Sequence, residues 1–501
     1  MAESAPRWEW RSFGRHFGAA EARFAALVPT GVHDSDEIYL LPGPDLNVKI
    51  RDARLEVKSL RATDADGLEQ WAPVVQAAFP LSAADAARIA AVLPIGLEAG
   101  CTLAGLLDRF DRSGAVRVHK RRAHYSVDGC MAELSDITVV GRTTRTIAIE
   151  SADAAAVIGA VRDLGLSDHF NSSYPRALPA LIDGQPERYA VIDVGTNSIK
   201  LHIAARGDAG SWAVVVDRAV VTRLGEGMNA TGMIGAAALE RTVAAIACMV
   251  AEARQHGVRA IAAVGTAGLR IAANAAGVLA TIRARTGVRI EVIPGTDEAR
   301  LAFRAATAGL AHGDGSLVVF DTGGGSSQFA FGHGGEIDES FSIDVGAARY
   351  TDRFGLDRAV SPEVLASAMA AISADLARLD GRPVPDALVG MGGAVTTIAA
   401  VGLGLARHDP DVIRGSVVDR TEIDRQIALY RQRDAAGRRD IPGLQPDRAA
   451  VILAGACIVR TVLEKLGRTS LVVSDRGLRH GVLNERFGAW SKAPAVRYHN
   501  V

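Results

Sequence analysis

The sequence predicts an α/β protein made of two related halves, with an α+β domain in front of them. A strand-type phrase occurs twice, as AVIDVGTNSIKLHI at residues 190–203 and as VVFDTGGGSSQFAF at residues 318–331. Aligning Asp193 with Asp321 gives an offset of 321 − 193 = 128 residues, about one domain length. After each copy, strand-type and helix-type segments alternate, which is the pattern of an α/β fold.

We expect the α+β domain to occupy residues 1–166. Strand-type segments with alternating polar residues flank a region at residues 65–112 that is largely typical of helix. Because successive strand residues point to opposite faces, these segments place basic side chains together on a sheet face. Such a face either lies in solvent or binds a polyanion, and a solvated outer face is the simpler interpretation for any one strand. The basic residues in question are Lys49, Arg51, Lys58, Lys120 and Arg122.

The remaining chain divides at a turn-rich segment. Residues 167–188 contain three prolines and no sustained periodicity, which is typical of a linker. We expect one α/β domain at residues 189–313 and a second at residues 314–490, each opened by one copy of the repeated phrase. A short tail at residues 491–501 follows.

Charge and composition exclude several classes of protein. A net charge of −1 gives no overall field that would attract nucleic acid or an anionic membrane. The N-terminus lacks the apolar segment of a secretory signal, and no apolar stretch is long enough to span a bilayer. The four cysteines lie far apart in the sequence, as expected for free thiols in a reducing compartment. We therefore expect a cytoplasmic protein without a nucleic-acid or membrane partner.

Each copy of the repeated phrase predicts a β-hairpin whose tip suits a phosphate group. Glycines let backbone N–H groups approach phosphate oxygens, and the side chains of Ser, Thr and Asn add donors. The aspartates before the tips, Asp193 and Asp321, are suited to hold Mg²⁺ beside that phosphate, usually through water. Two facing tips would form a phosphate–metal clamp. The tip residues are Gly195, Thr196, Asn197, Ser198, Gly323, Gly324, Gly325 and Ser326.

Three further places are candidates for the same clamp. Gly392 and Gly393 follow an apolar run and precede a helix, so they form either an anion site at the helix N-terminus or a tight turn. Arg270 follows a strand end, where it either reaches a phosphate or forms a surface salt bridge. Glu298 lies in the first turn of a helix between the two halves, where it either activates a water or complements the helix dipole. The histidines show no HxH or HxxxH spacing, which argues against a transition-metal site.

Six segments resemble, in the same order, the exopolyphosphatase/guanosine-pentaphosphate phosphohydrolase (Ppx/GppA) family over roughly residues 188–490. The resemblance implies two RNase H-like domains of the actin/Hsp70/sugar-kinase superfamily, flanking a cleft. It also implies Mg²⁺-dependent removal of the terminal phosphate from polyphosphate, or of the 5′ γ-phosphate from guanosine pentaphosphate. The segments are YAVIDVGTNSIKLHIA, VGTAGLRIAANA, IEVIPGTDEARLAF, LVVFDTGGGSSQFAFG, GMGGAVTTIA and VVSDRGLRHGVL.

The resemblance also implies roles for particular residues. Glu298 matches the catalytic glutamate, Asp193 and Asp321 match residues that position metal or water, and Arg270 matches an arginine near the phosphates. The two hairpin tips match the phosphate loops. The second loop of the family usually ends in an acid, GGGSxE, whereas this sequence has Gln328 there, which removes a charge from the predicted Mg²⁺ site. Because family members often dimerise, a homodimer is a further expectation.

The N-terminal strands resemble the CYTH (triphosphate tunnel) family, whose barrels of charged strands bind triphosphate-type ligands. The segments are KIRDARLEVKSL, HKRRAHYSVDGCMAELSDI and RTIAIES, while WEWRSFGRHF stands where the family has its ExExK signature. This departure favours binding of the polyanion over a second active site. We therefore expect an exopolyphosphatase. The alternatives are a guanosine pentaphosphate hydrolase and a non-catalytic sensor of polyphosphate or alarmone.

Overall fold

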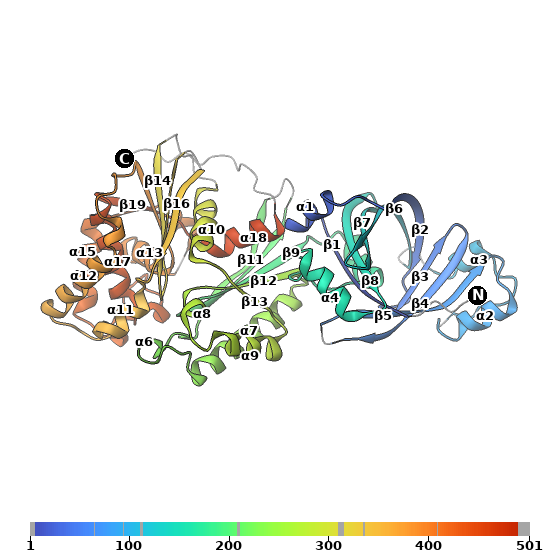
Figure 1. Cartoon of the computed structure of the whole chain (residues 1–501), viewed down its shortest axis with the longest axis horizontal. Helices are drawn as coiled ribbons and strands as arrows, with labels where there is room; N and C mark the ends of the chain where they lie inside the picture. The colour runs from blue at the N-terminus through green and yellow to red at the C-terminus, as the bar shows by residue number, and fades with distance from the viewer. Residues whose placement is uncertain are drawn as a thin grey trace.

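The computed structural model describes residues 6–488, apart from residues 65, 94, 111–113, 208–210, 309–314, 334–335 and 408. The expected tail at residues 491–501 and the expected boundary between residues 313 and 314 lie outside the described residues. The molecule is elongated, with an N-terminal barrel at one end, a first α/β sheet in the middle and a second one at the other end (Figure 1). Within the described ranges, no helix combines the length and apolar character needed to cross a membrane.

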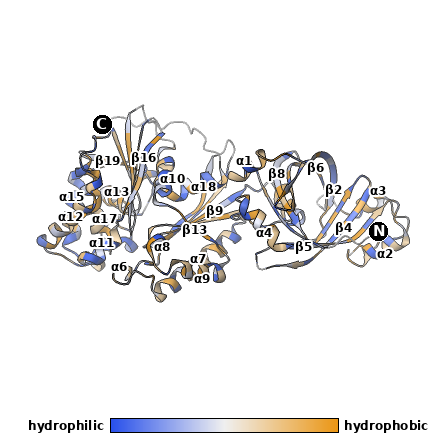
Figure 2. Ribbon diagram, in the orientation of Figure 1, coloured by the Kyte–Doolittle hydropathy of each residue, from blue (hydrophilic) through white to orange (hydrophobic). Residues whose placement is uncertain are grey.

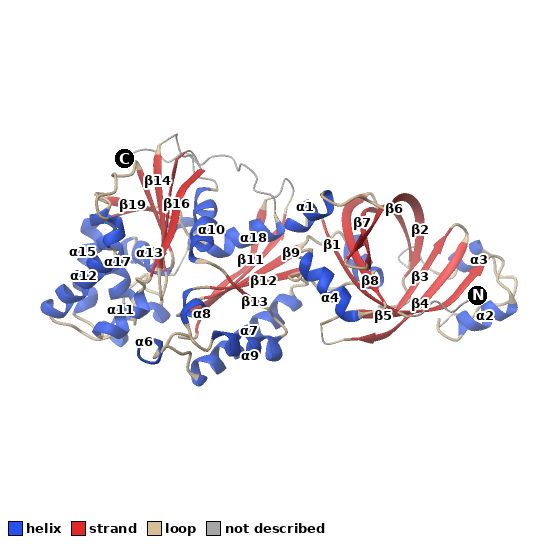
Figure 3. Ribbon diagram, viewed as in Figure 1, coloured by secondary structure: helices blue, strands red, loops and turns tan. Residues whose placement is uncertain are grey.

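The N-terminal domain is a closed barrel of eight antiparallel strands in the order β1-β5-β4-β3-β2-β6-β7-β8, drawn in red on the right of Figure 3. Closure turns one face of every strand inward, so the alternating polar residues line an interior rather than a solvated sheet face. The strands are β1 (Arg7–Gly14), β2 (Gly31–Leu40), β3 (Leu46–Arg51), β4 (Arg54–Thr63), β5 (Glu69–Ala78), β6 (Ala115–Val127), β7 (Cys130–Val139) and β8 (Arg142–Ser151). The accompanying helices are α1 (Ala19–Ala25), α2 (Ala83–Ala90), α3 (Leu103–Leu107) and α4 (Ala154–Asp163).

Two expectations for this part of the chain are wrong. The segment that forms β5 was expected to be helical, but it pairs with β1 and β4 and thereby closes the barrel. Long-range pairing overrides local helix propensity here, because an unpaired gap would leave two edges of the barrel open. The expected linker at residues 167–188 contains the helix α5 (Tyr174–Ile182), whose apolar face packs against inward-facing barrel residues such as Phe13 and Val118.

Tyr174 anchors α5 in the barrel. Its ring is 3% exposed, stacks on Tyr39 at a centroid distance of 4.8 Å and meets the edge of Phe13 at 5.0 Å. Its buried hydroxyl has no hydrogen-bond partner among the described residues. We therefore expect Tyr174→Ala to lower the free energy of unfolding by about 3–5 kcal/mol, the cost of emptying a large aromatic site. Tyr174→Phe should be nearly neutral in the same urea titration, and equal losses in both variants would contradict the packing role.

The first α/β body is a five-stranded sheet in the order β11-β10-β9-β12-β13. Its strands are β9 (Arg188–Val194), β10 (Ser198–Arg206), β11 (Trp212–Val221), β12 (Ala260–Gly265) and β13 (Ile290–Val292). Its helices are α6 (Met228–Thr231), α7 (Ala236–Gln255), α8 (Ala267–Ile271) and α9 (Ala275–Thr286), followed by α10 (Gly295–Thr307). In Figure 2 the outer helices carry both hydrophilic and hydrophobic residues, and one face of α7 is buried on this sheet, including Val243 and Ile246.

The second α/β body is a six-stranded sheet in the order β16-β15-β14-β17-β19-β18. Its first four strands repeat the order and directions of β11-β10-β9-β12, as the repeated phrase predicts. The strands are β14 (Ser316–Thr322), β15 (Ser327–His333), β16 (Glu336–Ile343), β17 (Ala387–Met391), β18 (Val417–Asp419) and β19 (Ser470–Val473). The helices are α11 (Ala347–Phe354), α12 (Pro362–Asp375), α13 (Gly393–Gly402), α14 (Pro410–Ile413), α15 (Arg420–Arg431), α16 (Ala435–Arg438), α17 (Ile452–Lys465) and α18 (Leu478–Phe487).

The two bodies exchange a helix, so packing does not follow the expected division of the sequence. Phe303 and Ala302 of α10 are buried against Val319 and other residues of the second sheet. At the end of the chain, Phe487 and Val482 of α18 are buried against the first sheet. The two exchanged helices also pack on each other where the bodies meet (Figure 1). A residue on α10 is therefore held between both sheets.

Candidate functional site

The two hairpin tips face each other across the junction between the sheets. A Cβ atom added at Gly324 would lie 2.7 Å from the Cβ of Asn197, and one added at Gly325 would lie 2.6 Å from Oγ1 of Thr196. The second tip therefore needs glycine to approach the first. Both tips have the same local turn, in which Gly195 N–H donates to the carbonyl of Ser198 at 3.1 Å and Gly323 N–H to that of Ser326 at 2.9 Å.

The aspartates before the tips occupy equivalent positions but have different neighbours. In the first hairpin, Asp193 is paired across the strands with Lys200, and its Oδ2 accepts a hydrogen bond from Lys200 Nζ at 3.1 Å. In the second hairpin, the residue opposite Asp321 is Gln328. No ion pair to Asp321 is formed by the described residues. Burial raises the pKa of Asp321, with Lys200 opposing and Asp193 adding to the shift. Asp321 is thus the less compensated carboxylate of the pair.

Glu298 lies in the first turn of α10, the helix held between both sheets. Glu298 is 8% exposed, and its Oε2 accepts a hydrogen bond from Nη1 of Arg270 at 2.7 Å. Burial raises the pKa of Glu298 to about 7; Arg270 opposes this shift, and the carboxylates of Asp193 and Asp321 add to it. A carboxyl group with such a pKa can accept a proton from water near neutral pH.

Most of the predicted site residues share one pocket. It is lined by the three acids, by all eight tip residues and by Gly393. Gly392 lines the groove next to this pocket. Glycine is required there because φ is 91° and because an added Cβ atom would lie 2.3 Å from Oδ1 of Asp321. The guanidinium of Arg270 donates to the carboxylate of Glu298 and to the carbonyl of Ile293 at 3.0 Å. Its observed side-chain contact is therefore with Glu298, the candidate for the catalytic base. A role of Arg270 on phosphate stays a prediction.

The fold brings several cations to the site that were not among the predicted site residues. Lys200 and Arg448 line the pocket, and Arg479 lines the adjoining groove with them. Arg448 comes from a single helical turn before α17, where a Cβ added at Gly393 would meet its guanidinium at 2.5 Å. The repeated phrase aligns Lys200 with Gln328, so the register of the hairpin could have identified the lysine. No local pattern marks Arg448.

Gln328 stands where the resemblance leads one to expect an acid. Its Nε2 donates to Oγ of Ser326 at 2.6 Å and to Oγ of Ser342 at 3.1 Å. Gln328→Glu would add a carboxylate beside Asp321, and both serine hydroxyls can turn to donate to it. Because charge count tunes the affinity of a site for a hard cation, the Mg²⁺ that the resemblance implies should bind the Gln328→Glu variant about tenfold more tightly. An unchanged Mg²⁺ affinity in a direct binding titration would place Gln328 outside the expected cation site.

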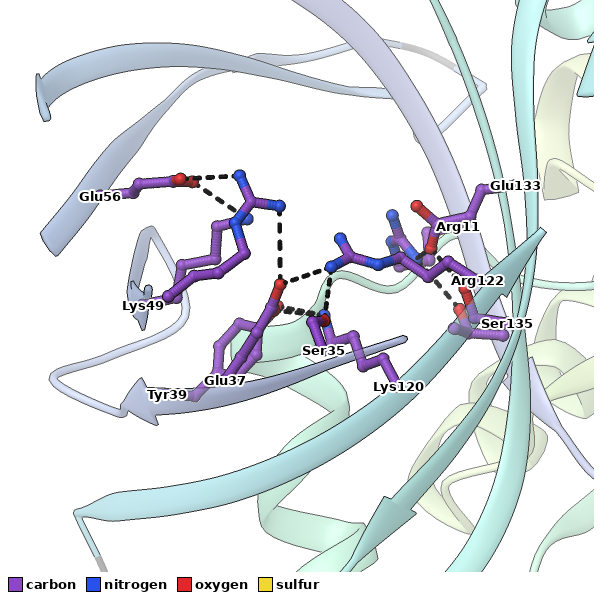
Figure 4. Close-up of polar contacts among 12 residues, drawn as sticks. Arg11, Ser35, Glu37, Tyr39, Lys49, Glu56, Lys120, Arg122, Glu133 and Ser135 are labelled. Atoms are coloured by element: carbon purple, nitrogen blue, oxygen red, sulfur yellow. Dashed lines mark hydrogen bonds and ion pairs between the residues drawn. The ribbon is translucent and has the colours of Figure 1, made fainter. Parts of the chain in front are cut away.

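Lys49, Lys120 and Arg122 lie inside the barrel, where Figure 4 shows them beside Glu37 and Glu56. Nζ of Lys120 contacts Oε2 of Glu37 at 2.8 Å, and Nη2 of Arg122 contacts Oε1 at 3.1 Å. Lys49 and Arg51 pair with Glu56 at 3.0 and 2.8 Å. With Lys120 only 2% exposed, a solvated outer face is wrong for this set. Lys58 lies near a different acid, Glu150: burial raises the pKa of Glu150, and the charge of Lys58 opposes this shift.

This cluster carries more cationic than anionic groups. Lys49, Arg51, Lys120 and Arg122 surround the two carboxylates of Glu37 and Glu56, which leaves 4 − 2 = +2 charges when all are ionised. Burial lowers the pKa of Lys120 to about 7, with Glu37 opposing the shift. Nε of Arg122 is buried without a hydrogen-bond partner among the described residues. Farther along the interior, Arg11 pairs with Glu9 at 2.8 Å and with Glu133 at 3.3 Å.

Comparison with known proteins identifies the family. A sequence profile described as the Ppx/GppA phosphatase family matches residues 203–488. "Exopolyphosphatase 2" of Mycobacterium tuberculosis is 31% identical over 322 residues, covering 59% of this chain and 97% of that protein. "Guanosine-5'-triphosphate,3'-diphosphate pyrophosphatase" of Photobacterium profundum is 28% identical over 322 residues, covering 62% of this chain and 61% of that protein. The solved structure of an Aquifex aeolicus member of the Ppx/GppA family is 30% identical, with a TM-score of 0.51, covering 59% of this chain and 96% of that one. The chain therefore belongs to the Ppx/GppA phosphatase family.

Proposed function

We propose that this protein is a phosphoric anhydride hydrolase that releases the terminal phosphate of inorganic polyphosphate, an exopolyphosphatase. One observation carries the proposal: a buried glutamate with a pKa raised to about 7 stands between two phosphate-type hairpin tips. The family and the exopolyphosphatase relative agree with this chemistry. We further propose that the two α/β bodies are RNase H-like domains and that the barrel is CYTH-like, which the repeated strand order and the closed eight-stranded barrel support.

The chain's own residues suggest how the reaction proceeds. The terminal phosphoryl group lies between the tips, where backbone N–H groups and the hydroxyls of Ser198 and Ser326 donate to its oxygens. Glu298 accepts a proton from a water molecule as the water oxygen forms its bond to phosphorus. The bond between that phosphorus and the bridging oxygen breaks, and the shortened chain leaves as a phosphate anion. Lys200 and Arg448 offset the negative charge in the pocket.

Mg²⁺ belongs to this proposal as the cofactor. The donors present are carboxylate oxygens, the ligands that this hard cation prefers, and the less compensated Asp321 fits the role better than Asp193. When bound, the ion would neutralise charge on the phosphate oxygens. Asp193 and Asp321 are the residues that would hold it.

Phosphate release in the presence of Mg²⁺ tests the function. Long polyphosphate, tripolyphosphate and guanosine pentaphosphate should be compared at equal concentrations of terminal phosphate. We expect the highest kcat/KM with long polyphosphate. A preference for guanosine pentaphosphate would support the second enzymatic function, which the Photobacterium relative favours. Tight binding without release from any of the three would support the sensor.

For the barrel we propose a binding role toward the same polymer, carried by the excess of cations in the cluster around Glu37 and Glu56 and by the unpartnered Nε of Arg122. Arg122→Gln should raise KM for long polyphosphate by about 10- to 100-fold, because a hydrogen bond to a charged group contributes about 1.5–3 kcal/mol. KM for tripolyphosphate, which cannot reach both sites, should not change. The matched control is Arg121→Gln, an exposed position on the same strand. Equal effects on both substrates would contradict the binding role.

A further inference from the structure

A second group of metal-ligating side chains lies outside the phosphate pocket. His202 follows Lys200 by two residues on β10 and thus points to the same sheet face. Directly opposite on β11 is Asp217, and α18 brings His480 onto the same face. One ligand atom from each of the three residues lies within 4.8 Å of the other two. The two imidazole rings are 4.5 Å apart between centroids.

The buried imidazole in this group lacks a normal hydrogen bond. His202 is 1% exposed, and its Nδ1 lies 3.5 Å from Oδ2 of Asp217, too far for a good hydrogen bond. That atom has no hydrogen-bond partner among the described residues. Nδ1 of His480 accepts a bond from the N–H of Gly477 at 3.3 Å, which leaves Nε2 available. A buried nitrogen without a partner, in a group with two other potential ligands, is one that a bound ion would satisfy.

We propose that His202, Asp217 and His480 bind a divalent transition-metal ion, with Zn²⁺ as the best match to two imidazoles and one carboxylate. This donor set differs from the all-oxygen set that suits Mg²⁺. Oδ2 of Asp217, which lies 3.5 Å from Nδ1 of His202, accepts hydrogen bonds from Nε of Arg479 at 3.3 Å and from Nη2 at 2.8 Å, so the arginine orients the carboxylate. Three protein ligands leave a fourth position for water.

The position of this site gives it a structural consequence. The two strand ligands belong to the first sheet, whereas His480 comes from the helix that returns to this sheet at the end of the chain. A metal ion would therefore fasten α18 to β10 and β11. Asp217 and Arg479 also line the groove that adjoins the phosphate pocket, so the ion would fix one wall of that groove.

Zinc binding to the 501-residue chain tests the proposal. The chelator-treated protein, kept in excess Mg²⁺ to fill hard-cation sites, is titrated with Zn²⁺ against a chromophoric chelator. We expect a single Zn²⁺ per chain and a rise in the thermal midpoint on binding. His202→Asn and Asp217→Asn should each weaken binding by at least about 100-fold, since loss of an outer-shell partner alone costs about 10- to 100-fold. Asp217 is partly exposed, so its variant is expected to fold.

Two controls separate this site from others. His333→Asn removes an exposed imidazole that also pairs with an aspartate, Asp338, and should leave zinc affinity unchanged. Asp321→Asn should leave it unchanged as well, because that residue belongs to the phosphate pocket. As an independent readout on the unaltered protein, Co²⁺ should give a visible absorption spectrum that Zn²⁺ abolishes. No zinc bound by the unaltered protein, or equal affinity in His202→Asn and His333→Asn, would overturn the proposal.

Discussion

Glu298→Gln is expected to lower kcat for phosphate release by about 10²–10⁴-fold while leaving the affinity for polyphosphate nearly unchanged. The amide has the shape of the carboxyl group and can still accept the bond from Arg270, but it cannot take a proton from water. Loss of one base whose contribution is confined to the transition state lowers kcat rather than raising KM. Initial rates of release and equilibrium binding of long polyphosphate measure the two quantities separately.

The pH dependence of kcat provides a second test of the role of Glu298. Burial raises the pKa of Glu298 to about 7, and the carboxylate is the active form, so kcat should fall as pH falls through about 7. The residual rate of Glu298→Gln should lack this dependence. Folding raises the pKa of Glu298, so above the pKa of the unfolded chain the ionised carboxylate destabilises the folded state. Glu298→Gln removes this charge, and the variant should therefore unfold at no lower temperature than the parent at alkaline pH. This measurement distinguishes a variant that has lost its base from one that is inactive because it has unfolded.

Asp297→Asn provides a matched control for Glu298→Gln. It changes the neighbouring acid in the same helical turn, which is half exposed and pairs with Arg300. Its kcat should stay close to that of the parent enzyme. Comparable losses in the two variants would show that the turn needs negative charge in general, and would contradict a specific base.

Asp321→Asn is expected to lower kcat/KM by about 10²–10³-fold, the loss typical of removing one preorganised electrostatic group. Asp193 is already neutralised by Lys200, whereas Asp321 faces the uncharged Gln328, so its charge is the one available to a cation. Raising the Mg²⁺ concentration should restore part of the activity. The measurement is a Mg²⁺ titration of phosphate release.

The matched control for Asp321→Asn is Asp338→Asn, an exposed acid on β16 of the same sheet. Its Mg²⁺ dependence should equal that of the parent. If Asp321→Asn changes kcat but not the Mg²⁺ dependence, the residue acts on the substrate or the water and the metal assignment is wrong.

The repeated hairpin could be predicted from sequence because its information is local. Asp193 and Asp321 end equivalent strands, and their alignment reproduces the cross-strand pairs Lys200 with Asp193 and Gln328 with Asp321. Glu298 was different. Its local sequence favoured a dipole-complementing acid, and only the resemblance to a family selected it as the catalytic glutamate. The physical reason for its pKa lies in burial between two sheets, which no local pattern encodes.

Other features depend on contacts between distant segments. The helix α5 was expected to be a linker because its prolines and turn formers hide an apolar face that only the barrel interior reveals. The exchange of α10 and α18 between the sheets depends on which surfaces are left open after each sheet forms. Likewise, His202 and His480 meet only because α18 returns to the first sheet, an approach that the spacing of histidines along the sequence does not reveal.

In the proposed reaction, water activated by Glu298 attacks the terminal phosphorus held between the two hairpin tips. The point of attack can be measured by hydrolysing tripolyphosphate in oxygen-18 water, with mass spectrometry of both products after one turnover. The predicted result is a single heavy oxygen in the released orthophosphate and none in the pyrophosphate. Label in the pyrophosphate would mean attack at the inner phosphorus and would contradict the proposed arrangement.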